Sequence, residues 1–295
     1  MSFAIKLPDS VTLYDGPTGM TQVMIRNRAA SASIALQGAH ILSFVPAGQQ
    51  DLLWMSDDAT YAKGKSLRGG IPICWPWFGA HNTDPKLPAH GHARTSEWSL
   101  IKAEDLGTDT TRLLFELKDS TDNRYFWGCA TRVRYSVTIG RELSLCLETT
   151  NLERRDITIG AALHTYFRIG DIEQTTVDGL NDCDYLDKVA GFARKPQTGL
   201  VRFNSEVDRI YLNTPQRCEI RDPLLQRRII IHSQGSHSTV VWNPGQIVAD
   251  KMGDLGQQGY RHMLCVETAN AAEDTQILAP NQVHRLSASY RITAY

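Results

Sequence analysis

The sequence predicts an all-β fold, a large antiparallel β-sandwich formed as one domain over residues 1–295. Short stretches in which apolar and polar residues alternate recur along the chain, and turn residues separate them at the spacing expected of a sandwich. We find no amphipathic helix longer than about three turns, so the strand–helix rhythm of a Rossmann domain or a TIM barrel is missing. No linker rich in glycine, serine or proline divides the chain, which favours a single domain.

The best-marked element is a hairpin near the middle of the chain. Residues 131–139 read TRVRYSVTI and alternate with period two, residues 143–149 read LSLCLET, and a Gly-Arg-Glu turn joins them. The same pattern predicts further strands at residues 111–117, 157–163, 228–232, 238–242, 264–268 and 285–293. By contrast, residues 62–94 are crowded with glycine, proline and aromatic residues. Long ordered loops of this kind on a β scaffold often carry a site.

The composition excludes several classes of function. The 31 lysines and arginines balance 32 acidic residues, so no global field steers the chain onto nucleic acid or an anionic membrane, and any bound anion needs a local cluster of arginines. The first ten residues lack the features of a signal peptide, and no apolar stretch reaches the roughly 18 residues of a membrane span. The six cysteines are widely spaced without a CxxC pair, so we expect free thiols and a cytoplasmic location. With no obvious apolar stripe, we expect a monomer.

Residues 68–79 read RGGIPICWPWFG and form the first candidate site segment. Gly69 and Gly70 let the backbone approach a ligand closely. Trp75 offers a flat apolar face of the kind on which sugar rings stack, although the aromatic residues of such a loop can equally be wedged into the core. Arg68, beside two glycines, is less easily explained as packing.

Residues 88–94 read PAHGHAR and form the second candidate segment. His90 and His92 are two residues apart, a spacing that puts both on one face of a strand, and Glu97 follows shortly afterwards. The spacing suits a metal site of the cupin type, but the second half of the cupin pattern, Pro-x-Gly followed by His, is absent. We therefore expect one histidine to line a pocket and the other to bond a backbone partner.

Three further segments place polar residues on or beside apolar strands. His164 ends the apolar stretch of LHTYF, and a single histidine on a strand is more often structural than catalytic. Glu267 ends the apolar stretch of CVETAN, where desolvation raises the pKa of a carboxyl toward that of a general base, unless an arginine pairs with it. Asp208 belongs to the polar cluster VDRIY, which has no clear meaning when read alone.

In this order, RGGIPICWPWFG, HGHAR, LHTYF, VDRIY and CVETAN resemble the hexose-6-phosphate mutarotases, or glucose-6-phosphate 1-epimerases, of the galactose mutarotase-like superfamily. The resemblance spans about 200 residues and implies a β-supersandwich with the sugar in a cleft on one sheet. Such enzymes are isomerases that open and reclose a sugar ring and so interconvert its α and β anomers. The resemblance implies neither a metal nor an organic cofactor, and it implies a small-molecule partner, a hexose 6-phosphate.

The resemblance also implies roles for four of these residues. Glu267 is the general base that takes the proton from the anomeric hydroxyl, and His164, as imidazolium, gives a proton to the ring oxygen. Arg68 and Arg94 match positions that hold the 6-phosphate, whose oxygens fit the guanidinium fork.

The remaining matches concern sugar contacts. Asp208 matches a residue that accepts hydrogen bonds from sugar hydroxyls, and His90 is a second imidazole near the ring oxygen or O1. Ala89 stands where the family often has a glutamine that contacts substrate, which leaves the preferred sugar open. Two other functions also stay open. One is an aldose 1-epimerase on free sugars, which needs no arginine pair, and the other is a sugar-phosphate-binding protein without turnover.

Overall fold

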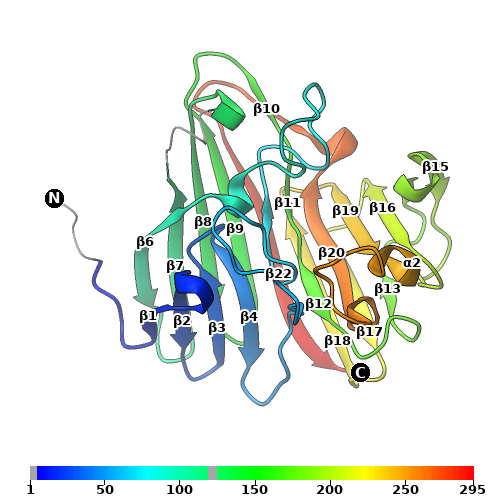
Figure 1. The fold of residues 1–295 in the computed structure, drawn as a ribbon, viewed down its shortest axis with the longest axis horizontal. Coiled ribbons are helices and arrows are strands. Elements are labelled where there is room, and N and C mark those ends of the chain that lie inside the picture. The colour runs from blue at the N-terminus through cyan, green and yellow to red at the C-terminus, as the bar shows by residue number, and fades with distance from the viewer. Residues whose placement is uncertain (1–4, 119–124) are drawn as a thin grey trace.

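The computed structural model describes residues 5–118 and 125–295, and its largest elements are two eight-stranded antiparallel sheets (Figure 1). Sheet I consists, in spatial order, of β13 (Thr176–Asp178), β17 (Arg217–Asp222), β18 (Arg227–Gln234), β22 (Val283–Ala294), β9 (Leu143–Asn151), β8 (Thr131–Ile139), β7 (Thr111–Leu117) and β6 (Trp98–Asp105). Sheet II consists of β15 (Ala193–Pro196), β14 (Asp184–Asp187), β16 (Val207–Leu212), β19 (Ser238–Asn243), β20 (Met263–Asn270), β11 (Ala161–Leu163) and β5 (Ile73–Cys74), with β12 (Tyr166–Arg168) also paired to β20.

Smaller elements complete the fold. Sheet III contains β1 (Val11–Asp15), β2 (Thr21–Arg26), β3 (Ala30–Ala35) and β4 (His40–Pro46), while β10 (Ile157–Ile159) pairs with β21 (Gln276–Leu278). The helical pieces include α2 (Gly245–Ala249) and the 3-10 turns η1 (Pro17–Gly19), η2 (Ala93–Thr95), η3 (Lys188–Ala190), η4 (Gly259–His262) and η5 (Ala272–Asp274). Within the described residues, no helix has the length and apolar character needed to cross a membrane.

The structure confirms the all-β prediction and most of the predicted strands. β7 and β8 begin and end at the predicted residues, and the others differ by a few residues at their ends. The single strand predicted over residues 157–163 is wrong, because the chain changes sheets at Gly160. The N–H of Gly160 donates to the Pro76 carbonyl at 2.8 Å, so β10 pairs with β21 while β11 joins sheet II.

One apolar cluster joins the three sheets and holds the sandwich together. Tyr135 of sheet I, Val266 of sheet II and Ile34 of sheet III all belong to it and are fully buried. Sheets I and II meet where the Phe167 ring packs edge-on against Tyr290, with centroids 5.1 Å apart. Burial of this size on facing sheets is the main source of stability in a β-sandwich.

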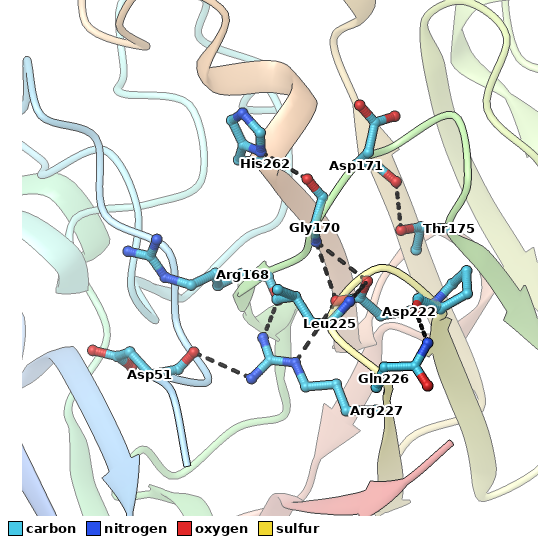
Figure 2. A network of polar contacts seen from close by, with 11 residues as sticks. Asp51, Arg168, Gly170, Asp171, Thr175, Asp222, Leu225, Gln226, Arg227 and His262 are labelled. Atoms are coloured by element: carbon cyan, nitrogen blue, oxygen red, sulfur yellow. Dashed lines mark hydrogen bonds and ion pairs between the residues drawn. The ribbon is translucent and has the colours of Figure 1, made fainter.

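A buried ion pair also ties sheet II to sheet I (Figure 2). Asp222, the last residue of β17, is fully buried and accepts hydrogen bonds from the Gly170 N–H at 3.1 Å and from the Leu225 N–H at 3.2 Å. Arg227 lies 3.7 Å from that carboxylate and donates to the backbone carbonyl of Arg168, the last residue of β12. The turn between β17 and β18 is therefore locked to the end of β12.

Candidate active site

Sheet II carries a polar cavity of about 280 Å³ on one face. Residues on the strands of sheet II, together with His164 between β11 and β12, form its floor, namely His164, Tyr166, Asp208, Val240, Trp242 and Glu267. Loop and turn residues form its rim, among them Arg68, Phe78, His90, Arg94 and Lys188. A cavity of this size holds a molecule such as a single sugar ring.

Strand register explains why these floor residues meet. β11 and β12 both pair with β20 in one register, with Leu163 opposite Thr268 and Tyr166 opposite Cys265. Continuing that register places His164 opposite Glu267. Cross-strand neighbours lie close together, and residues two apart share one face of a sheet. The register therefore brings an imidazole and a carboxyl to the same face.

His164 and Glu267 form a buried acid–base pair. Nε2 of His164 lies 3.4 Å from Oε1 of Glu267, and Glu267 is only 1% exposed. Within the described chain, His164 Nδ1 and Glu267 Oε2 have no hydrogen-bond partner from another side chain. Buried polar atoms are normally satisfied, so two such atoms beside a cavity indicate a place for ligand hydroxyls.

Burial shifts the pKa of both groups toward their neutral forms. Desolvation raises the pKa of Glu267 well above its usual value, an effect that the nearby Lys188 opposes and Asp208 reinforces. Desolvation also lowers the pKa of His164 well below its usual value. Both shifts favour the form of the pair in which Glu267 is protonated and His164 is neutral.

Aromatic rings fix the orientation of His164. The Tyr166 ring stacks on the imidazole at a centroid distance of 4.9 Å and an interplanar angle of 11°, and Trp242 packs against it edge-on at 6.1 Å. The hydroxyl of Tyr166 accepts a hydrogen bond from Nη1 of Arg68 at 3.0 Å. Tyr166 thus connects the imidazole to the arginine on the rim.

Arg68 is held in place from a second side by Asp254. Nε and Nη2 of Arg68 each lie 3.1 Å from one of the two carboxylate oxygens. A guanidinium has five N–H donors, of which Asp254 and Tyr166 occupy three, so two remain. Arg94 donates only to the Ala89 carbonyl, at 2.8 Å, and makes no ion pair within the described residues. The cavity therefore has two arginines with spare donors.

His90 lies between Phe78 and the acid–base pair. Its backbone adopts the left-handed conformation at φ 66°, and its ring lies 4.8 Å from that of Phe78 and 5.8 Å from that of His164. Burial, together with the charge of Arg94, lowers the pKa of His90 to about 3. The Gly79 N–H donates to Nδ1 at 3.4 Å, so the neutral ring carries its proton on Nε2.

Comparison with known proteins now identifies the family. A family model described as aldose 1-epimerase matches residues 21–291. The chain belongs to the aldose 1-epimerase family.

Individual relatives and a solved structure support the same family assignment. Proteins of Escherichia coli (strain K12) and Salmonella typhimurium (strain LT2), both named "Putative glucose-6-phosphate 1-epimerase", are 38% and 37% identical to this chain. These matches cover 92% and 86% of this chain and 90% and 84% of the relatives. The crystal structure of a Salmonella typhimurium protein described as "a putative mutarotase (YeaD)" has a TM-score of 0.91 at 31% identity and covers 99% of this chain and 96% of that one.

A more distant structure, galactose 1-epimerase from Lactobacillus acidophilus, shares the fold, with a TM-score of 0.69 at 14% identity over 98% of this chain and 99% of that one. These findings confirm the resemblance drawn from five short motifs. They also confirm that the chain is an isomerase of the mutarotase type with a galactose mutarotase-like fold.

Most of the residues expected in the site of this aldose 1-epimerase do line one cavity. The structure brings together His164, Glu267, Arg68, Arg94, Asp208 and His90.

Trp75 does not line that cavity, contrary to the interpretation that it stacks on a sugar. It is 1% exposed, and its indole N–H donates to Oγ1 of Thr149 on β9 at 3.1 Å. Its ring lies edge-on to His92 and to Trp127. The tryptophan is thus wedged into the core, the alternative that the sequence also allowed.

His92 lies on the Trp75 side, so it does not converge with His90. The reason is local, because the left-handed backbone at His90 and Gly91 breaks the alternation that would place both imidazoles on one face. A Cβ at Gly91 would also lie 2.0 Å from the Trp75 carbonyl. Within residues 5–118 and 125–295, no three side chains of His, Cys, Asp or Glu gather as a metal site.

Sequence reasoning missed several residues of the site. Tyr166 could have been found, because it follows His164 by two residues and so shares its face of the strand. Lys188 and Asp254 carry no motif signal. Pairing of β14 with β16 places Lys188 in the cavity, and the Arg68 contact places Asp254 behind it.

Proposed function

We propose that this isomerase interconverts the α and β anomers of a hexose 6-phosphate, with glucose 6-phosphate as the reference substrate. One observation carries the proposal: the buried pair of His164 and Glu267 lies in the same cavity as Arg68 and Arg94. The pair supplies the acid and base that ring opening needs, and the arginines supply donors for a phosphate. The names of the two enterobacterial relatives agree with this substrate.

Ring opening needs two proton transfers, one from the anomeric hydroxyl and one to the ring oxygen. The reaction starts when the proton of the pair has moved from Glu267 to His164. The carboxylate of Glu267 then takes the proton of the anomeric hydroxyl, the carbonyl forms at C1, the bond from C1 to the ring oxygen breaks, and the imidazolium of His164 protonates that oxygen. The pair then consists of a carboxylic acid and a neutral imidazole, the arrangement that burial favours. Rotation about C1–C2 and the reverse proton transfers close the ring on the other face.

The other cavity residues bind and orient the sugar phosphate. The two spare N–H groups of Arg68 and the guanidinium of Arg94 hold the 6-phosphate, which a bidentate fork recognises better than an ammonium group does. Asp208 accepts hydrogen bonds from ring hydroxyls, and His90 donates one from Nε2 near the ring oxygen or O1. Every step uses side chains of this chain only.

Three further properties of the enzyme are its domain organisation, its oligomeric state and its location in the cell. We infer a single domain over residues 1–295, supported by a core cluster whose members run from Val11 to Tyr290. The monomeric state and the cytoplasmic location expected from the sequence stay predictions.

The test is the rate of anomer exchange at equilibrium, measured by NMR saturation transfer with glucose 6-phosphate and then with glucose. We expect acceleration for the phosphorylated sugar and little for glucose. Arg68→Ala should raise the KM for glucose 6-phosphate steeply without changing turnover of glucose. Equal acceleration of both sugars would assign the enzyme to free aldoses, and no acceleration of either would indicate a binding protein.

A further inference from the structure

Lys188 is a third cation of the cavity, and it contacts Asp208. Its Nζ lies 2.6 Å from Oδ2 of Asp208. The contact follows from strand register, because β14 pairs with β16 with Asp187 opposite Arg209, and continuing that register places Lys188 opposite Asp208. Both side chains line the same cavity as Glu267 and are partly open to it, with 26% of Lys188 and 17% of Asp208 exposed.

The pair has unused hydrogen-bonding capacity. An ammonium group has three N–H donors and a carboxylate about four acceptor positions, yet the contact between them uses one of each. Within the described residues, neither Oδ1 of Asp208 nor the other two donors of Lys188 has a protein partner. A donor and an acceptor thus stand next to each other at the wall of a cavity sized for a sugar.

We propose that Lys188 and Asp208 together form a subsite for two neighbouring hydroxyls of the sugar ring, one donating to the carboxylate and the other accepting from the ammonium. The inference rests on the proposed function and deepens it, because it assigns the choice among hexose 6-phosphates to this pair. Adjacent ring hydroxyls lie about a hydrogen-bond length apart, which matches the separation of Nζ and Oδ2. Inverting either carbon redirects one hydroxyl and leaves a charged group without its partner.

The same chain offers a matched control for Lys188. Lys195 on β15 makes a contact of the same length with Asp187, with Nζ 2.6 Å from Oδ2. That pair does not line the cavity. Lys188→Met and Lys195→Met therefore remove ion pairs of the same length, one inside and one outside the proposed subsite.

The experiment compares KM and kcat for anomer exchange with glucose 6-phosphate and with its epimers at C2, C3 and C4, the 6-phosphates of mannose, allose and galactose. Because a hydrogen bond to a charged group is lost, Lys188→Met should raise the KM for glucose 6-phosphate about 10- to 100-fold. The advantage of glucose 6-phosphate over at least one epimer should shrink by a similar factor, with kcat little changed at a pH above the acid limb of the profile of both enzymes. Lys188→Arg should restore part of the selectivity, and Lys195→Met should match the wild type.

Two results would overturn the subsite. An unchanged KM in Lys188→Met would mean that the ammonium does not touch the sugar. An equal rise in KM for all four sugars would mean that Lys188 acts on the shared phosphate. If the wild type accelerates exchange of none of them, the proposed catalysis fails, and calorimetric dissociation constants for the same four sugars and variants then test the subsite alone.

Discussion

Nε2 of His164 lies 3.4 Å from Oε1 of Glu267 although the two residues belong to different segments of the chain. The contact exists because β11 and β12 pair with β20 in a common register, so the residue between those two strands falls opposite Glu267. An acid and a base in direct contact inside the protein hold one proton between them. Removing either member should therefore affect catalysis far more than folding.

Glu267→Gln should abolish most of the anomer exchange. The amide has nearly the same shape but takes up no proton, so we expect a loss of roughly 10²–10⁴-fold in kcat for glucose 6-phosphate. The matched control is Glu116→Gln, which should keep full activity. Glu116 forms an ion pair with Arg134 on sheet I. Saturation-transfer NMR measures both variants, and a Glu267→Gln enzyme with wild-type kcat would remove this residue from the mechanism.

The pH dependence of kcat/KM should move in opposite directions in two variants. Catalysis by a carboxylate base rises with pH through the pKa of Glu267. The charged and titratable groups that face this carboxyl come from several elements and are His164, Asp208, Lys188, Arg68, Arg94, His90, Tyr166, Cys74, Cys265 and Tyr290. Lys188⁺ lowers its pKa and Asp208⁻ raises it. Lys188→Met should therefore shift the acid limb to higher pH, and Asp208→Asn should shift it to lower pH.

The pH profile is best recorded as kcat/KM for glucose 6-phosphate, because the apparent pKa then belongs to the coupled pair in the free enzyme. Lys195→Met should leave the limb where it is in the wild type. If both cavity variants shift it in the same direction, charge at these two positions does not control the base.

Tyr166→Phe should weaken phosphate binding while sparing the chemistry. The substitution removes the hydroxyl that accepts from Arg68 but keeps the ring that stacks on His164. We expect the KM for glucose 6-phosphate to rise about 2- to 10-fold, the effect of one hydrogen bond, with kcat nearly unchanged. Tyr185→Phe, outside the cavity, is the control. A fall in kcat with constant KM would instead show that the hydroxyl serves the acid–base pair.

Arg227→Met should destabilise the fold. The guanidinium is buried beside Asp222 (Figure 2), and its loss leaves a buried carboxylate without a counter-charge, which costs about 3–5 kcal/mol. Arg228→Met on the same strand removes an exposed guanidinium that bonds only a backbone carbonyl and should change the unfolding free energy by less than about 0.5 kcal/mol. Urea denaturation compares the two, and equal effects would refute the role given to the buried pair.

Stability should fall when the pH drops from 7 to 5, partly because of His40. Burial lowers the pKa of this histidine to about 4, while Nε2 bonds the Gly69 carbonyl at 2.7 Å. Below about pH 6.5 the unfolded chain binds a proton here that the folded chain does not, so unfolding is favoured progressively until about pH 4.

At pH 5 this histidine alone should cost about 2 kcal/mol. His40→Gln keeps an N–H donor but does not titrate, so its loss of stability between pH 7 and 5 should be smaller by that amount. Denaturation curves at the two pH values measure it, and parallel losses in both proteins would contradict the prediction.

Alternation between buried and partly open positions marks the best-predicted strands of sheet I, whereas β19 and β20, which were also predicted, are buried at nearly every position. β8 shows buried and less buried positions in strict alternation, and its bounds were predicted correctly. β4 is buried at nearly every position, and sheet III was not predicted. β3 of that sheet does alternate in burial, but its sequence ASASIA is mostly alanine and serine, so its pattern has little apolar contrast. Weak contrast in the sequence, together with the covering of β4 by other layers, hid sheet III.

The sequence by itself predicted five of the eight strands of sheet I, namely β7, β8, β9, β18 and β22. It also indicated the residue types of the acid, the base and the two arginines, because alternation and short motifs are local properties of a chain. Only the tertiary structure decided which of those residues share a cavity. Strand register placed Lys188 beside Asp208, and a left-handed turn at His90 sent Trp75 and His92 into the core. The register between strands that are distant in the chain depends on contacts between those segments, which a local pattern does not specify by itself.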